Sequence, residues 1–209
     1  MQFPEPIIKR AVAFFDGQNL FRHAMAAFGY YHPNYDPVKL TDAICLDRGW
    51  IRQGVRFYTG TPSEDRDARW HAYWSNRLVT MRRAGISVTT RPIRYRETAN
   101  VGSDGRPQIA VTAQEKGIDV RLALDIVRFA FANRYDVALI FSQDQDLAEV
   151  VPDVKEIAKM QQRWVKLACA FPSGANATSA RGIRDTDWIP MTKEFYDRCL
   201  DPRDYRPKK

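Results

Sequence analysis

The chain has 209 residues, of which 44% are hydrophobic and 27% charged, so it can bury the core of one substantial domain. This composition excludes a disordered polymer, and no apolar run approaches the roughly 20 residues that span a bilayer. Lysine and arginine total 32 against 25 acids, and the resulting net charge of +7 weakly favours a polyanionic partner.

The cysteines and the N-terminal residues indicate in which cellular compartment the protein is expected. Cys45, Cys169 and Cys199 lie far apart and form neither a zinc pattern nor a disulfide framework, which favours a reducing environment. Residues 1–10 lack the apolar stretch and cleavage site of a signal peptide. We therefore expect a cytoplasmic protein that does not contact a membrane.

Short apolar runs alternate with longer helical patterns along the chain. We expect strands at 11–15, 54–59, 86–90, 137–141 and 164–171. Helices are expected at 20–28, 37–46, 65–84, 117–132 and 145–162, the last broken or restarted at Pro152, and 188–200 is expected to be partly helical. Strands that alternate with helices and are continuously apolar predict an α/β domain with a mainly parallel sheet covered on both faces.

Residues 91–113 are less regular than the rest of the chain. The turn signal at 102–105 lies between two short apolar segments, which predicts a β-hairpin arm. No linker divides the sequence. We expect a single domain over residues 1–200, with an arm-like insertion near 91–113 and a polar C-terminal tail at 201–209.

Carboxylates follow two of the expected strands. Asp16 comes directly after the first strand, and Asp144 and Asp146 follow strand 137–141. Ligands of parallel α/β sheets bind beyond the carboxyl ends of the strands. If these two strands are neighbours, the three acids converge at one edge of the sheet together with Asp119, which starts the intervening helix.

Asp119 is the most informative of the four acids. At about 100° per residue it shares a helix side with Ala123, Ile126 and Ala130, so we expect it to face the core. A core carboxylate without a partner costs several kcal/mol, and a bound cation would relieve that cost.

Asp125 falls on another side of the same helix, beside Arg121 and Arg128. Ion pairs one helical turn away would satisfy it there. We expect Asp125 to be solvated and paired.

Each of the four acids also has a purely structural interpretation. Asp144 and Asp146 are suited to cap and charge the next helix, and Asp16 before Gly17 to form a turn. Asp119 would complement a helix dipole. The prediction of a metal site would fail only if all four structural interpretations were correct at the same time.

Clustered carboxylates without neighbouring histidine or cysteine favour Mg²⁺ or Mn²⁺ over zinc. Such an ion binds few carboxylates together with waters and phosphate oxygens, and it lowers the pKa of a bound water. Hydrolysis of a phosphodiester is the chemistry that fits this site in a positively charged chain.

Three segments, in order, resemble one known family. Residues 14–20 (FFDGQNL), 116–125 (KGIDVRLALD) and 142–147 (SQDQDL) are similar to the signatures of NYN domains, the LabA-like branch of the PIN-like nuclease superfamily. The resemblance implies a PIN-like Rossmannoid three-layer sandwich that cleaves RNA with a bound metal ion. Gln143 and Leu147 depart from the family pattern, in which glycine and an aromatic residue are usual.

The resemblance also implies roles for individual residues. The metal ligands would be Asp16, Asp119, Asp144 and Asp146. Asn19 would complete the catalytic set by orienting a water, a ligand carboxylate or the substrate. Ser142 would support the site through hydrogen bonds. Asp125 also matches a family position, but its pairing with Arg121 and Arg128 in the helix projection makes it a supporting residue rather than a metal ligand.

The arm carries basic residues that suit contacts with phosphate groups. They are Arg91, Arg94, Arg96 and Arg106, followed by Lys116. The alternative is an edge hairpin protected by its charge, with Lys116 as a surface residue.

These observations lead to two main hypotheses. The first is an endoribonuclease that uses Mg²⁺ or Mn²⁺ on single-stranded or locally unpaired RNA. The alternative is a catalytically weak or inactive RNA-binding protein of the same fold. A phosphohydrolase with an aspartyl nucleophile is disfavoured, because no second acid follows two residues after Asp16. The aromatic residues Trp70, Tyr73 and Trp74 are expected in the core or in a homodimer interface.

Overall fold

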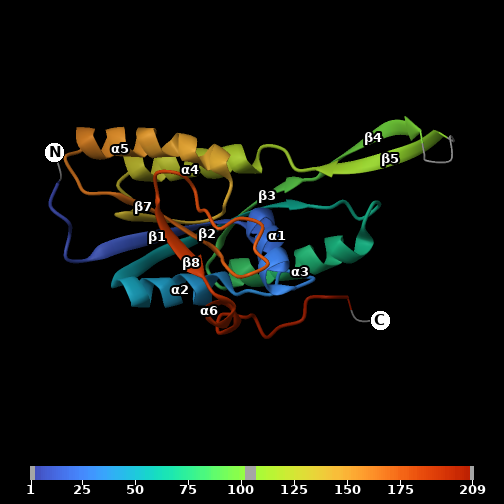
Figure 1. Cartoon of the computed structure of the whole chain (residues 1–209), viewed down its shortest axis with the longest axis horizontal. Helices are drawn as coiled ribbons and strands as arrows, with labels where there is room; N and C mark the ends of the chain where they lie inside the picture. Colours follow the sequence, from blue (N-terminus) through green and yellow to red (C-terminus); the bar gives the residue numbers. More distant parts are fainter. Residues whose placement is uncertain (1–2, 102–106, 208–209) are drawn as a thin grey trace.

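The computed structural model describes residues 3–101 and 107–207 and shows a central sheet with helices on both faces (Figure 1). The strands are β1 (Lys9–Asp16), β2 (Trp50–Thr61), β3 (Ser87–Pro92), β4 (Arg94–Val101), β5 (Pro107–Gln114), β6 (Val137–Phe141), β7 (Lys166–Pro172) and β8 (Asp187–Met191). The helices are α1 (Gly17–Phe28), α2 (Pro37–Arg48), α3 (Ala68–Arg83), α4 (Ile118–Phe131), the 3-10 turn η1 (Gln145–Glu149), α5 (Val150–Met160) and α6 (Lys193–Asp197).

The sheet has the strand order β3-β2-β1-β6-β7-β8, and all five pairings are parallel. The chain builds outward from β1 to β3 on one side and then from β6 to β8 on the other. The carboxyl ends of β1 and β6 therefore lie together where the strand order reverses, which is the ligand position of such sheets. The predicted α/β fold with a mainly parallel sheet is confirmed.

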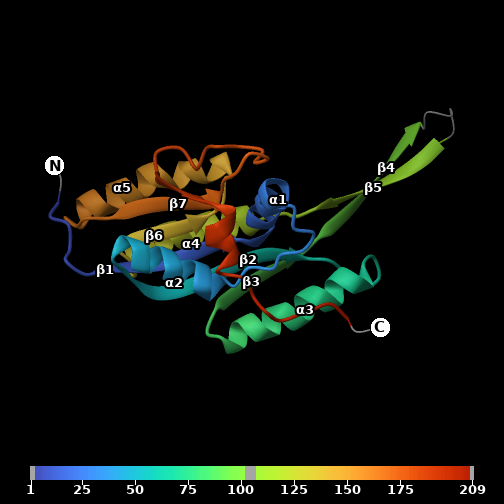
Figure 2. The ribbon, with the colours of Figure 1, turned by 60° about the horizontal axis from the view of Figure 1, so that its bottom comes forward.

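The two faces of the sheet carry separate hydrophobic clusters. Along β1, Ala13 and Phe15 point to the cluster shared with α1, α2 and α3, whereas Val12 and Phe14 point to the cluster shared with α4 and α5. Figure 2 shows these helices on opposite sides of the sheet. Because both faces are covered, the strands are continuously apolar rather than alternating.

The segment 188–200 differs from the expectation of a partial helix. Its first part is the edge strand β8, and only Lys193–Asp197 is helical. Pro190 has no amide hydrogen to donate, and this suits an edge strand. At Pro152 the expected restart is present, because η1 ends and α5 begins two residues before it, which leaves proline in the tolerant first turn.

Strands β4 and β5 pair in antiparallel register from Arg94↔Gln114 to Val101↔Pro107. This hairpin projects well beyond the body of the molecule (Figure 1). The predicted arm is therefore present, while its turn and Arg106 lie outside the described residues.

The segment after α6 is attached to the core through a buried arginine. Arg77 has no exposed surface and donates to the Tyr73 hydroxyl (2.7 Å) and the Tyr35 carbonyl (2.6 Å). Its guanidinium lies 5.9 Å from the ring centre of Tyr205, which is itself buried. Aromatic faces and neutral oxygens thus stabilise this cation and fix the chain near its C-terminal end.

Arg10 and Asp136 join the amino ends of β1 and β6. Asp136 accepts hydrogen bonds from the Arg10 amide (2.8 Å), Nε (2.9 Å) and Nη2 (2.9 Å). Burial opposes ionisation of Asp136, but these hydrogen bonds outweigh it and lower the pKa of Asp136 below its ordinary value of 3.8. The stabilisation is therefore complete above the ordinary pKa and is lost as the pH falls through the folded-state pKa.

The substitution Asp136→Asn should lower the free energy of unfolding at pH 7 by about 1–2 kcal/mol, a moderate value because Arg10 is partly exposed. Urea denaturation at several pH values should show the difference from wild type shrinking below pH 4. The control Asp187→Asn removes an exposed pair with Lys166 and should cost under about 0.5 kcal/mol. An Asp136→Asn cost that is the same at pH 3 and pH 7 would contradict this account.

Candidate functional site

Asp16 ends β1 and caps helix α1. Its Oδ1 accepts a hydrogen bond from the Asn19 amide (3.1 Å), and its Oδ2 accepts one from the Ser142 hydroxyl (3.2 Å). Since Ser142 directly follows β6, this carboxylate joins the ends of two neighbouring strands. Only 8% of the residue is exposed.

Burial governs the charge of Asp16. Loss of solvation raises the pKa of Asp16 to about 6, and the nearby charge of Asp144 adds to the effect. The hydrogen bonds from Asn19 and Ser142, and the charge of Arg22, oppose it without cancelling it. The ionised form is thus under-compensated in the protein alone.

The loop after β6 presents Asp144 and Asp146 differently. The Asp144 amide donates to the Ser142 hydroxyl (3.1 Å), and Asp144 Oδ1 accepts from the Asp146 amide (3.1 Å), so Asp144 caps η1. Asp144 is half-buried next to Asp16, whereas Asp146 is exposed. Asp144 therefore caps η1 and at the same time lies close to Asp16.

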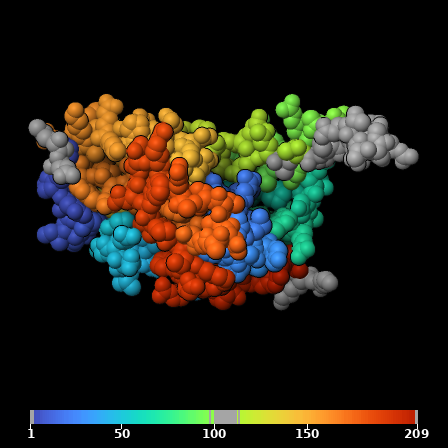
Figure 3. Space-filling model, viewed as in Figure 1, coloured from blue at the N-terminus to red at the C-terminus, as the bar shows by residue number. Residues whose placement is uncertain are grey.

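Asn19 and Gln143 hold this loop in place. Asn19 Oδ1 accepts from the Gln143 amide (2.9 Å), and Gln143 Nε2 donates to the carbonyls of Ser179 (3.2 Å) and Arg181 (2.7 Å). The glutamine that departs from the family pattern therefore fastens the β7–β8 loop beside the site. Figure 3 shows that loop, in orange, lying against α1, in blue.

Glu115 is a residue of this site that the sequence analysis missed. It follows β5 directly, and burial raises the pKa of Glu115 to about 7, with Asp16 and Asp119 adding to the shift. Its Oε2 is buried and has no hydrogen-bond partner among the described residues. A carboxylate at the end of a strand, directly before the Lys116-Gly117 segment, was the signal in the sequence.

The structure corrects the position of Asp119. It lies exposed in the first turn of α4, and the buried side of that helix carries Ile118, Leu122 and Ile126. The prediction that Asp119 faces the core is wrong: Ile126 and Ala130, which share its side in the projection, are buried, but Asp119 stands in the first turn of α4, where that side is open to solvent. Its charge still acts on Glu115, which places it at the rim of the site.

Asp125, expected to be solvated, is 1% exposed. It accepts hydrogen bonds from Arg121 Nη2 (2.6 Å), Arg56 Nη2 (3.1 Å) and the Tyr58 hydroxyl (2.8 Å). The pairing with Arg121 is therefore correct and the solvent exposure is wrong. These partners come from α4 and β2, so Asp125 ties the helix to the sheet.

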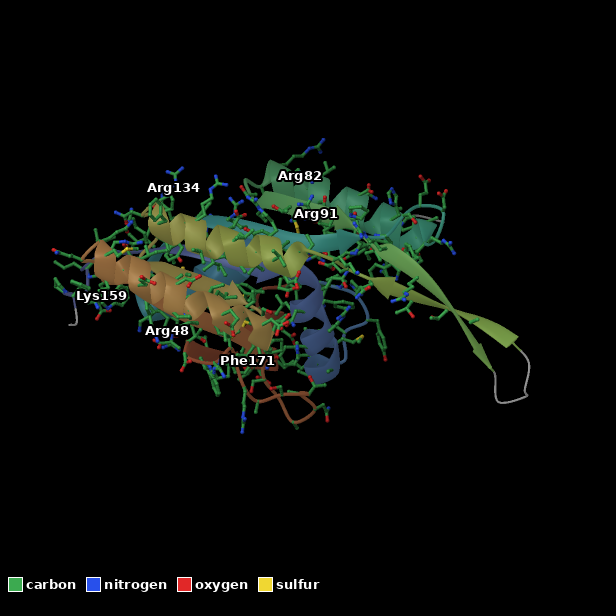
Figure 4. The ribbon with its side chains drawn as sticks, turned by 90° about the horizontal axis from the view of Figure 1, so that it is seen from above. Arg48, Arg82, Arg91, Arg134, Lys159 and Phe171 are labelled. Carbon is green, nitrogen blue, oxygen red and sulfur yellow. The ribbon has the colours of Figure 1, made fainter. Side chains whose placement is uncertain are left out.

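The basic residues assigned to RNA contact are exposed where the structure describes them. They are Arg91, Arg94, Arg96 and Lys116. Figure 4 shows Arg91 on the body of the molecule rather than on the projecting part of the hairpin.

The described residues thus bring together Asp16, Glu115 and Asp144, with Asp119 acting on Glu115 from the rim. Asp146 points to solvent at the edge of the loop. Within residues 3–101 and 107–207, no group of three or more His, Cys, Asp or Glu side chains is close enough to hold a metal ion. The carboxylates are neighbours, but they do not form a closed cage.

Residues 10–179 match the model of the NYN domain, and the chain belongs to this family. Two solved structures show weaker likeness. A protein of unknown function from Vibrio parahaemolyticus is 14% identical, with 97% of this chain and 98% of that chain covered and a TM-score of 0.47. A ribokinase from Giardia lamblia is 11% identical, with 88% and 56% covered and a TM-score of 0.37.

We draw no functional conclusion from these two structures, because both TM-scores are low. The comparison with curated proteins gave no match. None of the described helices combines the length and the apolar character that crossing a membrane requires.

The two aspartates of α4 make a matched pair for a stability test. Asp125→Asn should lower the free energy of unfolding by about 1.5–3 kcal/mol, because the buried side chain loses its charge-assisted hydrogen bonds to the partly exposed Arg56 and Arg121. Asp119→Asn on the same helix should cost under about 0.5 kcal/mol, since that side chain is exposed. Urea denaturation of both variants measures the difference, and equal costs would show that our assignment of the buried side of α4 is wrong.

Proposed function

We propose that this chain is an endoribonuclease of the LabA-like, PIN-like type that hydrolyses RNA with a bound Mg²⁺ or Mn²⁺ ion. The observation that carries the proposal is the approach of the buried Asp16 and the half-buried Glu115, whose Oε2 atom is itself buried, at the carboxyl edge of the sheet. Burial raises the pKa of both groups. The charge of Asp144 adds to the shift of Asp16, the charges of Asp16 and Asp119 add to that of Glu115, and the charge of Arg22 opposes both shifts. The match to the NYN domain family supports a nuclease-type hydrolase.

The residues present fit a hard divalent ion. Glu115 Oε2 is a buried oxygen without a hydrogen-bond partner in residues 3–101 and 107–207, and the groups beside it supply oxygen atoms, as Mg²⁺ and Mn²⁺ prefer. Mg²⁺ usually takes only one or two carboxylates and completes its shell with water and substrate phosphate. An open arrangement without three clustered ligands is compatible with that mode of binding.

In this proposal Asp16 and Glu115 hold the ion, Asp144 lies close to Asp16, and Asp119 and Asp146 stand at the rim. The bound ion would supply a water of lowered pKa and would stabilise charge on the phosphate. Ser142 fixes the orientation of Asp16, and Asn19 fixes the loop that carries Asp144. These two residues therefore position the carboxylates before substrate binds.

The basic residues complete the proposed substrate path. Lys116 lies next to Glu115, Arg91 ends the sheet strand β3, and Arg94 and Arg96 continue into the hairpin, so they would contact phosphates of a single-stranded or locally unpaired RNA. We extend the proposal to a single domain over residues 1–200, to a cytoplasmic location, in keeping with three free cysteines, and to a homodimer.

The second candidate is an RNA-binding protein with little or no catalytic activity. The absence of a three-ligand group among the described residues and the exposure of Asp119 favour it. RNA binding that EDTA leaves unchanged, with no product after long incubation, would select it over the nuclease.

The substitution Asp16→Asn keeps the shape of the side chain and removes its charge. At a Mn²⁺ concentration about 100 times the dissociation constant, wild type should gain roughly 2.7 kcal/mol of stability, whereas Asp16→Asn should gain almost none. Mn²⁺-dependent cleavage of single-stranded RNA should fall by about 100-fold or more, because the ligand that carries the proposal is lost. Thermal denaturation with and without Mn²⁺, and gel assays of RNA cleavage, measure the two effects.

The control is Asp47→Asn, which changes an exposed aspartate at the end of α2, where the chain enters β2 at the opposite edge of the sheet. It should retain both the Mn²⁺ stabilisation and the cleavage. If Asp16→Asn cleaves RNA as fast as wild type, the nuclease assignment is wrong.

A further inference from the structure

A pocket lined by aromatic rings lies beside the carboxylate site, between α1, the start of α3 and the root of the β4–β5 hairpin. Figures 1 and 2 both show these three elements near one another. Its volume is about 270 Å³, and Phe21, Trp70 and Tyr95 form part of its wall. We call it the aromatic pocket.

The aromatic pocket and the carboxylate site are bordered by neighbouring residues of the same two chain segments. Gln18 lines it two residues after Asp16, and Pro62 lines it two residues after Gly60. A side chain on Gly60 would come within 2.7 Å of Glu115 Oε2, so Gly60 touches the site while Pro62 touches the pocket. The same helix start and the same strand end therefore border both.

The rings of the aromatic pocket are only partly engaged with the core. Phe21, Trp70 and Tyr95 are each half-buried, while Trp74 behind them is buried. The ring centres of Phe21 and Trp70 are 6.4 Å apart at 51°, which is too tilted for the two rings to cover each other's faces. Of the aromatic residues expected in the core, Tyr73 and Trp74 are there, and Trp70 faces the pocket.

Charges around the aromatic pocket separate a backbone path from a base site. Arg66 lies with its guanidinium 5.8 Å from the ring centre of Tyr95, and Arg94 is exposed next to it, so the rim is cationic. Inside, Asp67 lines the pocket and caps α3 by accepting from the Trp70 amide (3.0 Å). A carboxylate in the lining repels a phosphate group, whereas a neutral heterocycle is not repelled.

We propose that the aromatic pocket binds one unpaired nucleobase of the RNA whose backbone crosses the carboxylate site. The inference rests on the proposed function for the identity of the substrate. The volume lies just below the range of about 300–1,000 Å³ that drug-sized ligands occupy, so it suits a single heterocycle. Stacking on aromatic side chains is the usual way in which proteins hold unpaired bases.

The proposal assigns the selection of single-stranded RNA to this pocket. A base enters it only when it has left its stack and its pairing partner. A duplex would therefore reach the basic hairpin but would not fill the aromatic pocket.

Two variants test the proposal by RNA binding in EDTA, where no cleavage occurs. Phe21→Ala and Tyr95→Ala should each weaken the binding of a fluorescein-labelled single-stranded RNA of about ten nucleotides by about 5- to 100-fold in fluorescence anisotropy. Their matched controls are Phe131→Ala and Tyr31→Ala, which remove exposed rings elsewhere and should bind as wild type does. Circular dichroism and thermal denaturation confirm that each variant is folded.

A second measurement separates base binding from a structural role of the rings. A series of oligonucleotides is made in which each one lacks the base at a different position. At one of these positions, wild type should lose about as much affinity as Tyr95→Ala loses with intact RNA. Tyr95→Ala should show no additional loss at that position, because the contact is already absent. Wild type that is indifferent to base removal at every position would overturn the proposal.

The outcome for the aromatic pocket is distinguishable from that for the nuclease. If wild type cleaves RNA with Mn²⁺ and both ring variants bind and cleave equally well, the pocket proposal is wrong and the nuclease stands. If the ring variants lose RNA binding but wild type gives no product, the pocket proposal stands and the nuclease is wrong.

Discussion

The site depends on the burial of one carboxylate, that of Asp16, at the end of the central strand. This side chain starts α1 by capping it and joins β1 to the residue that follows β6. Those structural tasks keep it out of water, and the same burial raises the pKa of Asp16 to about 6. The fold thus places a carboxylate where it is structurally useful and where its negative charge needs a further partner.

The hairpin contributes to both parts of this region. The end of β5 leads into Glu115, whose charge acts on Asp16, and the start of β4 provides Tyr95 in the aromatic pocket. An arm that served only as a protected edge would have no need to place residues at both positions. Its root therefore joins the acidic site to the surface proposed for the base, while its outer part extends beyond the body.

Most of the fold could be predicted from the sequence, because apolar strands followed by turn residues are local signals. The order of the elements left open whether β1 and β6 are neighbours, and the structure shows that they pair and so bring Asp16 close to Asp144. The buried side of α4 could not be predicted, because the hydrogen bonds that stabilise the buried Asp125 come from Arg56 and Tyr58 on β2, far away in sequence. Glu115 was missed for a related reason, because the groups that act on its carboxylate, the Gly60 backbone and the charge of Asp16, lie far away in sequence.

Two other buried charges of the described residues have different surroundings, and the Nε of Arg77, like Glu115 Oε2, lacks a hydrogen-bond partner there. Asp125 receives two arginines and a tyrosine, and Arg77 is surrounded by neutral oxygens and aromatic rings. Asp16 and Glu115 are different, since each lies in the field of another acid and Glu115 Oε2 has no partner among the described residues. Since Asp125 is paired with two arginines in the same fold, the negative charge gathered at the strand ends is the charge that the proposed metal ion would balance.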